Sequence, residues 1–354
     1  MNNKEINIFF IEKNKTIRSA MKQMTANGRK CLVVVDNNSF YGTLSDGDIR
    51  KSLLNGNSLD TLISNCANTS SYVLNSGVST QEEKIKKIFY DKKFDFIPIV
   101  NHKDMSITDI LFWDDFLQED EKLKQLDIPV YIMAGGAGSR LKPFTDVLPK
   151  PLVPIGDKTV IERIIDQFTK HKSDNFYISI NYKSKILKAF FEELNPEYKL
   201  NFIMEEKPLG TGGSLSLAKD SIKTDFILTN CDVIFDIDFF DLVEFHKDSK
   251  NSITIVASTK EITLPYGNLI LDQDGNLEST EEKPSFDFLV NTGMYVINPS
   301  VLELIQKNKK IDFTDVIDTA ISKKFKVGVY PINEDSWIDT GQWSEYKRAI
   351  NKLG

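Results

Sequence analysis

The chain has 354 residues, of which 41% are hydrophobic and 27% are charged, and its formal net charge is −7. This length predicts two domains, and the acidic balance argues against a broad nucleic-acid-binding surface. No apolar run approaches the roughly 20 residues of a membrane span, and the first residues lack the apolar segment of a signal peptide. The three cysteines are scattered and form neither a disulfide framework nor a zinc-ligand pattern. We therefore expect a cytoplasmic globular protein without a nucleic-acid or membrane partner.

An internal repeat of roughly 64 to 65 residues occupies the first third of the chain. Apolar spacing in the first copy predicts a helix, two strands and the start of a second helix, at 16–24, 31–35, 40–44 and 45–50. The second copy predicts a helix, a strand and a further apolar segment, at 82–89, 96–100 and 107–110. We place the two copies at about 1–64 and 65–118, followed by a charged linker at 119–127.

This repeat resembles a tandem pair of CBS domains. The first copy carries that family's closing motif at Gly42, Ser45, Asp48 and Ile49. The second copy has no glycine at this point and lacks two residues between Thr108 and Asp109. CBS pairs often bind adenine nucleotides between their copies, and the resemblance implies Ser45 and Asp48 as ligand contacts. A dimerisation or scaffolding module without a ligand is the alternative.

Beyond the linker, from 128 to 354, strand-like apolar runs alternate with helical segments. They lie at 129–133, 160–169, 176–180, 185–193, 200–204, 213–219 and 226–229. Such alternation is typical of a mostly parallel sheet, in which ligands bind at the carboxyl ends of the strands. The fold class that we expect is therefore α/β, with a Rossmann-like sheet preceded by an α+β module.

A glycine-rich loop follows the first strand of this region, as Gly135-Gly136-Ala137-Gly138-Ser139-Arg140, and Pro149-Lys150-Pro151 comes shortly after. Glycines let successive backbone N–H groups face an anion, and a helix opening beyond the loop would add its dipole. Arg140 and Lys150 supply cations for phosphate. A dinucleotide fingerprint would need glycine where Leu141 stands, and the Gly-Lys-Ser/Thr of a P-loop is absent.

These residues resemble the opening motif of the sugar-phosphate nucleotidyltransferase family, whose fold is GT-A-like, with Ser139 in place of the usual threonine. The resemblance implies that Arg140 neutralises the departing pyrophosphate and that Lys150 holds the α-phosphate region. It also implies nucleotide contacts from Ala134, Gly135, Gly136, Gly138 and Ser139.

The segment 205–213, Glu-Glu-Lys-Pro-Leu-Gly-Thr-Gly-Gly, looks like the family's base-recognition loop. The residues that it implies as nucleotide contacts are Glu206, Gly210, Thr211 and Gly212. A carboxylate here could accept from two guanine N–H groups, whereas uracil and thymine offer one. This favours guanine only weakly, and an ion pair between Glu205 or Glu206 and Lys207 is the alternative.

An aspartate after an apolar strand suits a hard divalent cation that also contacts phosphate oxygens. Asp232 follows the strand 226–229, and Asp339 lies in Trp-Ile-Asp-Thr-Gly, which resembles a later motif of the family. The resemblance implies that the two carboxylates jointly hold Mg²⁺. Cys231 stands where the family commonly has glycine, and we expect this change to affect packing.

Sugar recognition rests on shorter motifs. Glu282-Lys283-Pro284 matches the motif in which Glu282 receives a sugar hydroxyl and Lys283 holds the sugar phosphate. The remaining residues implied as sugar contacts are Tyr182, Gly267 and Asn291. For Tyr182, core packing is an equal alternative.

The sequence shows no Ser-His-Asp set and no catalytic cysteine. A sugar 1-phosphate is already ionised at pH 7, so the chemistry needs positioning and charge neutralisation rather than a general base. The domain order resembles CBS-fused glucosamine-1-phosphate guanylyltransferases of legionaminic acid pathways, which implies GTP, glucosamine 1-phosphate and a homo-oligomer. The alternatives are a uridylyl-, thymidylyl- or cytidylyltransferase acting on another hexose 1-phosphate, and a regulatory CBS protein without catalysis.

Overall fold

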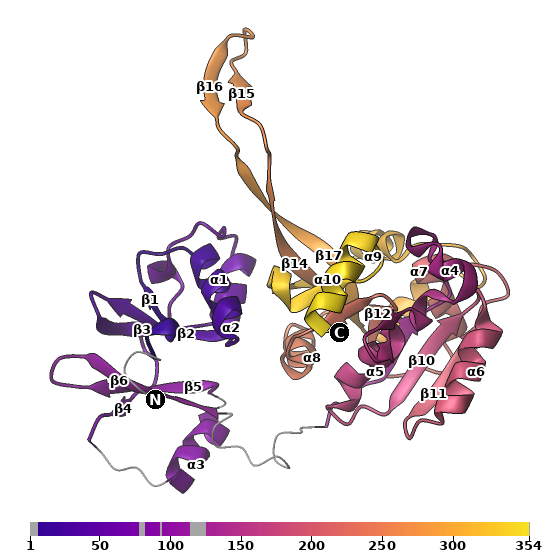
Figure 1. Ribbon diagram of the computed structural model, residues 1–354, viewed down its shortest axis with the longest axis horizontal. Coiled ribbons are helices and arrows are strands. Elements are labelled where there is room, and N and C mark those ends of the chain that lie inside the picture. The colour runs from indigo at the N-terminus through magenta and orange to yellow at the C-terminus, as the bar shows by residue number, and fades with distance from the viewer. Residues whose placement is uncertain (1–5, 78–81, 93, 114–124, 354) are drawn as a thin grey trace. The chain divides into compact units, whose positions relative to one another are not determined.

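The computed structural model describes residues 6–77, 82–92, 94–113 and 125–353. The chain divides into two compact units, Met1–Lys122 and Leu123–Gly354, which are described separately. Figure 1 shows the elements of both units. Most of the predicted linker at 119–127 lies outside the described residues. Within the described ranges, no helix is long and apolar enough to cross a membrane.

The first unit contains one six-stranded sheet in the order β1-β2-β3-β6-β5-β4. In the first half β1 pairs in parallel with β2, and β2 forms an antiparallel hairpin with β3. In the second half β4 pairs in parallel with β5, and β5 forms an antiparallel hairpin with β6. The hairpins carry matching register shifts at Val34/Val35 and Ile99/Val100, so the two halves share one strand pattern. The strands are β1 Phe10–Glu12, β2 Cys31–Asp36, β3 Ser39–Ser45, β4 Leu74–Asn75, β5 Phe96–Asn101 and β6 Ser106–Phe112, and the helices are α1 Ile17–Asn27, α2 Asp46–Leu54 and α3 Glu82–Lys92.

A capping box starts helix α2. The Ser45 hydroxyl accepts from the Asp48 N–H, and the Asp48 carboxylate accepts from the Ser45 N–H at 2.8 Å and from its hydroxyl at 2.7 Å. The two residues predicted to contact a CBS ligand thus hydrogen-bond to each other at the start of this helix. In the second half Thr108 and Asp109 lie inside β6 instead, so the equivalent cap is absent among these residues.

The second unit is built on a seven-stranded sheet in the order β11-β10-β7-β12-β17-β14-β18. Six of these strands run in one direction and β17 runs against them, so the prediction of a mostly parallel sheet is confirmed. The strands are β7 Val130–Met133, β10 Asn175–Ile180, β11 Lys199–Met204, β12 Phe226–Asn230, β14 Ile253–Thr263, β17 Ser285–Ile297 and β18 Val327–Ile332.

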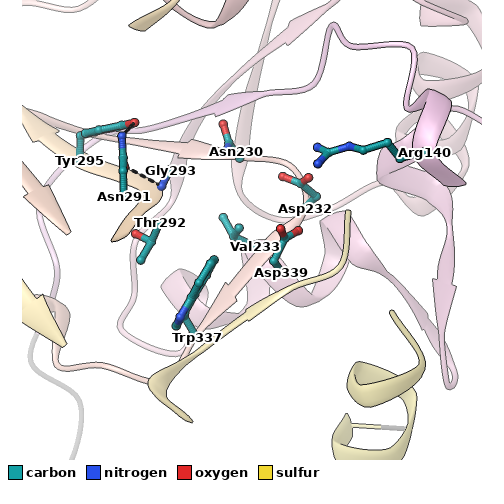
Figure 2. Close-up of a pocket in the computed structure, with 10 residues that line it drawn as sticks. All are labelled: Arg140, Asn230, Asp232, Val233, Asn291, Thr292, Gly293, Tyr295, Trp337 and Asp339. Carbon is teal, nitrogen blue, oxygen red and sulfur yellow. Dashed lines mark hydrogen bonds between the residues drawn. The ribbon is translucent and has the colours of Figure 1, made fainter. Parts of the chain in front are cut away.

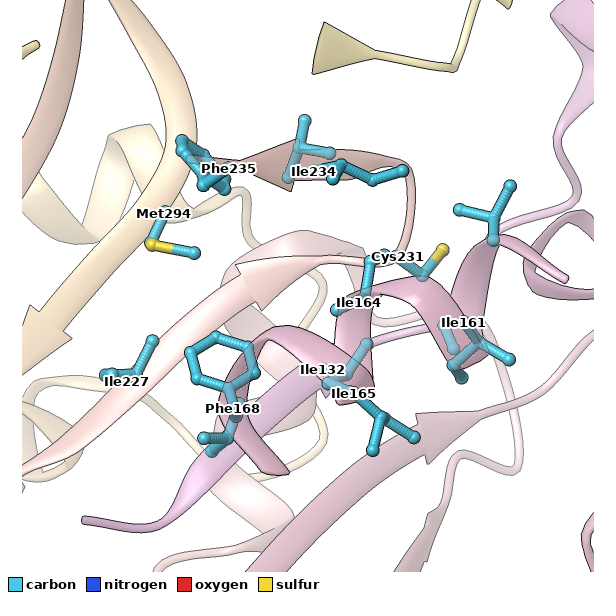
Figure 3. Close-up of a cluster of buried hydrophobic side chains, with 14 of the residues drawn as sticks. Ile132, Ile161, Ile164, Ile165, Phe168, Ile227, Cys231, Ile234, Phe235 and Met294 are labelled. Atoms are coloured by element: carbon cyan, nitrogen blue, oxygen red, sulfur yellow. The ribbon is translucent and has the colours of Figure 1, made fainter. Parts of the chain in front are cut away.

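Alternating side chains of the central strands feed two separate cores on the two faces of this sheet. Ile132 and Ile227 join the core beneath α5, whereas Tyr131 and Leu228 join the core beneath α9 (Figure 3 shows the first). Cys231 is buried in the first core, and burial raises the pKa of its thiol to about 12, as expected for a packing role. The longer helices are α5 Val160–Thr169, α6 Ser184–Leu194, α8 Phe239–Asp248, α9 Phe313–Ser322 and α10 Trp343–Leu353.

The remaining helices and strands of this unit are short. They are the helices α4 Phe144–Val147 and α7 Gly210–Gly213, and the strands β8 Pro154–Ile155, β9 Lys158–Thr159, β13 Val233–Phe235, β15 Asn268–Leu271, β16 Leu277–Glu281 and β19 Trp337–Asp339.

Two segments predicted as α-helices are shorter helical turns in the structure. The helix predicted over 213–219 is the short α7 followed by a 3₁₀ turn, Ser214–Leu217. The helix expected beyond the glycine loop is a 3₁₀ turn, Ser139–Leu141, followed by an extended Lys142. Pro143 explains the second error, because proline disfavours helical geometry in the residue before it and lacks a backbone N–H.

One buried histidine makes stability depend on pH. His246 on α8 is 1% exposed, and its Nδ1 lies 2.8 Å from the Thr254 hydroxyl. Burial lowers the pKa of His246 below 6.5, the nearby Asp225 carboxylate opposes this shift, and Lys247 reinforces it. Below pH 6.5 the unfolded chain therefore takes up a proton that the folded chain resists, and stability falls as the pH falls.

We expect the free energy of unfolding to fall by up to about 1.4 kcal/mol per pH unit below 6.5 because of this histidine. His246→Gln should remove that part of the slope and leave the slope above pH 6.5 unchanged. Urea unfolding of the wild type and of His246→Gln between about pH 5 and about pH 7.5 measures how the free energy of unfolding depends on pH. Identical slopes for the two proteins below pH 6.5 would contradict the expectation.

Candidate active site

A pocket lies where two neighbouring parallel strands end. β7 and β12 pair side by side, with Met133 opposite Asn230 at their carboxyl ends. The predicted glycine loop follows β7, and Asp232 follows β12. Figure 2 shows the lining residues, which are Arg140, Asn230, Asp232, Val233, Asn291, Thr292, Gly293, Tyr295, Trp337 and Asp339. The sequence had placed four of them in the candidate site, Arg140, Asp232, Asn291 and Asp339.

The glycine loop needs glycine at two positions for different reasons. Gly138 has φ +65°, and a Cβ there would lie 2.8 Å from Lys150 Cβ and 2.9 Å from a Thr145 methyl. The Thr145 hydroxyl also donates to the Gly138 carbonyl at 2.9 Å. A Cβ on Gly135 would lie 2.5 Å from a carboxylate oxygen of Glu205. The loop is therefore held against the segments that carry Lys150 and Glu205.

A short antiparallel ladder brings Asp232 and Asp339 together. β13 pairs with β19, with Val233 opposite Asp339. Thr340 reinforces the pairing, because its N–H and its hydroxyl both donate to the Asp232 carbonyl, at 2.7 and 2.9 Å. The Gly341 N–H donates to Asp339 Oδ1 at 2.7 Å. The two predicted metal ligands therefore share one wall of the pocket.

Opposite charges meet at this wall. Lys150 Nζ forms an ion pair with Asp232 Oδ2, and each side chain is 11% exposed. Burial raises the pKa of the Asp339 carboxyl, and the negative charge of Asp232 raises it further. The Gly341 N–H and the charges of Lys150 and Arg140 act in the opposite direction. Two carboxylates held this close favour a bound cation.

The geometry fits a magnesium ion. A methyl group built on Gly341 would contact Asp232 Oδ2 and would lie 2.8 Å from Asp339 Oδ1, so both carboxylates border the same small space. Mg²⁺ is often held by one or two carboxylates together with water and substrate phosphates. Within the described residues, no cluster of three or more His, Cys, Asp or Glu side chains could hold a metal. Asp232 and Asp339 would therefore hold the ion jointly with a substrate.

The predicted base-recognition loop contains one buried and one exposed glutamate. Glu205 is 6% exposed, and its carboxylate accepts from the Leu209 N–H at 3.0 Å. Burial raises the pKa of Glu205, and the Leu209 N–H and Ser179 oppose this shift. Glu206, the predicted base contact, is exposed. Glu205 is therefore placed to shape the loop, and Glu206 stays the candidate for contact with a base.

The glycines of this loop face the protein rather than open space. A Cβ on Gly210 would lie 2.6 Å from the Ile311 carbonyl, and one on Gly212 would lie 2.9 Å from a Val316 methyl. The Thr211 hydroxyl accepts from the Phe313 N–H at 2.9 Å. At Gly210 and Gly212 the missing side chain therefore makes room for residues at the start of α9.

Replacing Glu205 by Ala should lower the free energy of unfolding by about 1–3 kcal/mol, because the Leu209 N–H loses its buried acceptor. Glu206→Ala is the matched control, and its unfolding free energy should stay within about 0.5 kcal/mol of the wild type. Equal stability of the two variants in urea would contradict the anchoring role of Glu205.

The predicted sugar contacts are not all at the pocket. Asn291 lines it, and its side chain donates to the Tyr295 hydroxyl at 2.8 Å. Tyr182 is outside the lining, and its hydroxyl donates to the Thr145 carbonyl at 3.2 Å. Gly267, Glu282 and Lys283 are exposed and lie in the chain between the β14–β17 ladder and the small sheet β15–β16, which stands at the outer end of the β-ribbon (Figure 1).

The sequence motifs contain Asn230 and Gly293 but do not single out either residue as a contact, although both line the pocket. Gly293 has φ +83°, and a Cβ there would contact the Asn230 side chain. Asn230 immediately precedes the Cys231-Asp232 pair, so its position at the end of a strand was the available signal. The need for glycine at 293 arises from the β12–β17 pairing, which a single sequence does not show.

A family model described as nucleotidyl transferase matches residues 130–354. The chain belongs to the nucleotidyl transferase family. A CBS domain model matches residues 4–55, which lie within the first copy of the repeat and include its capping box.

The transferase region is similar to curated and solved members of this family. It is 34% identical over 230 residues to the mannose-1-phosphate guanyltransferase of Debaryomyces hansenii, covering 61% of this chain and 61% of that protein. The chain thus spans about three-fifths of the length of the curated relatives that it matches. Crystal structures of HddC from Yersinia pseudotuberculosis, alone and complexed with GMP-PN, are 26% identical, with TM-scores of 0.52 and 0.50. Each covers 64% of this chain and 100% of the HddC chain.

Proposed function

We propose that the chain transfers GMP from GTP to a sugar 1-phosphate and releases pyrophosphate. The observation that carries this proposal is the convergence of Asp232, Asp339 and Lys150 around Gly341, with Arg140 on the same pocket. Buried carboxylates facing lysine and arginine suit a metal-bound triphosphate, because the ion and both cations neutralise phosphate charge.

The reaction is a single displacement. A phosphate oxygen of the sugar 1-phosphate attacks the α-phosphorus of GTP, the bond from that phosphorus to the oxygen bridging to the β-phosphate breaks, and pyrophosphate leaves with this oxygen. Bound Mg²⁺ would neutralise triphosphate charge between Asp232 and Asp339. Arg140 offsets charge that develops on the leaving group, Lys150 holds the α-phosphate region, and the loop from Ala134 to Ser139 positions the phosphates.

Guanine is supported by two independent lines. The relative from Debaryomyces hansenii is named a mannose-1-phosphate guanyltransferase. One HddC structure is a complex with GMP-PN, which is named as a derivative of the guanine nucleotide GMP. The exposed carboxylate of Glu206 offers an acceptor for two guanine donors. Uracil and thymine each offer only one such donor.

For the acceptor we propose glucosamine 1-phosphate, with GDP-glucosamine as the product, as in legionaminic acid-type pathways. The support is the domain order, because a CBS module precedes the transferase. Mannose 1-phosphate is the competing acceptor, and the names of the relatives favour it.

An activity matrix tests both parts of the proposal. The full chain is incubated with each of GTP, UTP, dTTP and CTP, together with glucosamine, mannose or glucose 1-phosphate and Mg²⁺, and pyrophosphate is measured. We expect GTP with glucosamine 1-phosphate to give the highest kcat/KM. Turnover with UTP or dTTP but not GTP would overturn the guanylyl assignment, and a preference for mannose 1-phosphate would overturn only the sugar.

The CBS module gives a separate proposal, an adenine nucleotide bound near Ser45 and Asp48. A change in the rate of the transferase on addition of AMP or ATP would support it. An unchanged rate, together with an altered oligomeric mass when residues 1–120 are deleted, would favour the assembly role instead.

A further inference from the structure

A long two-stranded ribbon extends from the transferase sheet. We call residues 259–289 the arm; they comprise the outer parts of β14 and β17 together with the small sheet β15–β16 (Figure 1, orange). The neighbours on the sheet stop earlier, because β18 pairs with β14 only as far as Ser258 and β12 pairs with β17 only from Met294 onward. Beyond these points the two strands of the arm pair with each other, out to Thr263 opposite Ser285.

One face of the arm is apolar and exposed. Directly opposed residues share a face, so Ile262 and Phe286 lie together, and Phe288 lies on the same side. Their exposed fractions are 50%, 46% and 49%. The opposite face is more polar, as the contact between the Thr263 and Ser285 hydroxyls at 2.8 Å shows. The outer end adds further exposed apolar side chains, Tyr266, Leu269, Leu271 and Leu277.

Such an arm needs a surface to pack against. An isolated two-stranded hairpin is marginally stable in water, and a continuous exposed apolar patch marks an interaction site. In the part of the chain that the structure describes, the outer parts of β14 and β17 are paired with each other, and another strand could join the opposite backbone edge of each.

The arm carries the predicted sugar-phosphate residues Gly267, Glu282 and Lys283 away from the pocket of their own chain. A strand rises about 3.4 Å per residue, so Ser285 lies roughly 20 Å along β17 from Asn291 at the pocket wall. Lys283 lies beyond Ser285. Continuous pairing from Ala257 opposite Asn291 outward prevents the arm from folding back without breaking this ladder.

The pocket, for its part, is short of positive charge. Among the described residues, Arg140 lines the pocket and Lys150 pairs with Asp232 at its wall. These two cations are matched by Asp232 and Asp339, so the four groups sum to no net charge. A triphosphate and a sugar phosphate together bring several negative charges, of which one divalent ion offsets two. Lys283 would supply a further positive charge. The Lys283 of the same chain is held away from this pocket by its own arm, whereas the Lys283 on the arm of a second copy is not bound by that constraint.

We propose that the arm of one copy docks through its apolar face on a second copy and brings Glu282 and Lys283 to the pocket of that copy. The exchange is reciprocal in a two-fold dimer, so each sugar-phosphate site is built from two chains. This inference rests on the proposed function, because it assigns to the exchanged residues the sugar phosphate of the same reaction.

Complementation between two inactive variants tests the exchange. Asp232→Asn and Lys283→Ala chains carrying different affinity tags are co-expressed, and the mixed dimer is purified through both tags. Each single variant should lose at least about 10²-fold in turnover, as expected when a group contacting a transferring phosphate is removed. The mixed dimer contains one pocket with an intact wall that receives an intact arm, so it should regain about half of the wild-type activity.

A mixed dimer of Asp232→Asn with Lys150→Met is the control, because both changes affect the same wall and neither pocket can be repaired. It should stay inactive. An inactive Asp232→Asn/Lys283→Ala dimer, or a fully active Lys283→Ala single variant, overturns the exchange and leaves the guanylyl assignment intact. If the wild type turns over no nucleotide, the proposed function fails. The docking of the arm is then tested only by the oligomeric mass of the wild type and of the arm variants.

Sedimentation equilibrium supplies that second measurement. The wild type should be a dimer, and Phe286→Ser combined with Phe288→Ser should shift it to monomer without changing the circular dichroism of the fold. Leu289→Ser, an exposed apolar residue on the opposite face of the same strand, is the matched control and should leave the dimer intact. A monomeric wild type, or a Phe286/Phe288 variant with unchanged mass, overturns docking through this face.

Discussion

Replacing Asp232 by Asn should lower pyrophosphate release at least about 10³-fold, which corresponds to about 4 kcal/mol of transition-state stabilisation. The substitution keeps the shape of the side chain and removes one of two carboxylates that border the space above Gly341. It also leaves Lys150 without its buried counter-charge. The loss should therefore appear chiefly in kcat, with a weaker dependence of the rate on Mg²⁺ concentration.

Asp236→Asn is the matched control for this experiment. Asp236 is exposed and lies immediately after β13, whose first residue follows Asp232. Its replacement should leave turnover unchanged, because its side chain is not part of the pocket lining. Thermal unfolding of both variants separates a local loss of function from a loss of fold. Turnover within about tenfold of the wild type for Asp232→Asn would contradict the metal-site assignment, and would revive the alternative of a regulatory protein without this chemistry.

Local features of the fold were predictable because their causes are local. The Thr16 and Ser45 side chains cap α1 and α2, and a hydroxyl side chain just before an apolar helical pattern is a local signal for a helix start. The repeat was visible because both copies place an apolar strand before a turn, and these strands are β2 and β5 in the structure. The glycine loop after β7 could be recognised for the same reason, since strand, loop and cations are close together in the chain.

Features that depend on distant pairing could not be derived in the same way. Nothing in the local sequence states that Val233 pairs with Asp339, although this register places the two acids at one wall. The tight fit of Gly210 against Ile311 depends on where α9 begins in space. The sequence motif assigned Lys283 to the sugar phosphate and so implied a position beside the pocket. The long β14–β17 ladder instead carries Lys283 away from the pocket of its own chain. A motif therefore fixes a residue's chemical character, and only the strand register fixes which pocket it can reach.

Replacing Gly341 by Ala should lower kcat by about 10²-fold or more, because displacing catalytic groups by about an ångström costs that much. The new methyl group would contact Asp232 Oδ2 and would lie 2.8 Å from Asp339 Oδ1 and 3.0 Å from Lys150 Nζ. Carboxylates and lysine would have to move apart, and the methyl would occupy the space that a shared cation needs. Gly341 has no left-handed φ, so the backbone should tolerate alanine and the cause of the loss is confined to this contact.

Gly47→Ala provides the matched control for the Gly341 variant, because a Cβ at Gly47 would lie at an ordinary 3.6 Å from the Ser45 hydroxyl oxygen. Alanine within helix α2 should raise stability slightly, by up to about 1 kcal/mol, and leave turnover unchanged. Pyrophosphate release measured across a range of Mg²⁺ concentrations distinguishes the two mechanisms for Gly341→Ala. If the methyl displaces a cation shared by the acids, the half-saturating Mg²⁺ concentration rises together with the fall in kcat. Wild-type kcat and an unchanged Mg²⁺ dependence would show that the space above Gly341 is not where catalysis needs the ion.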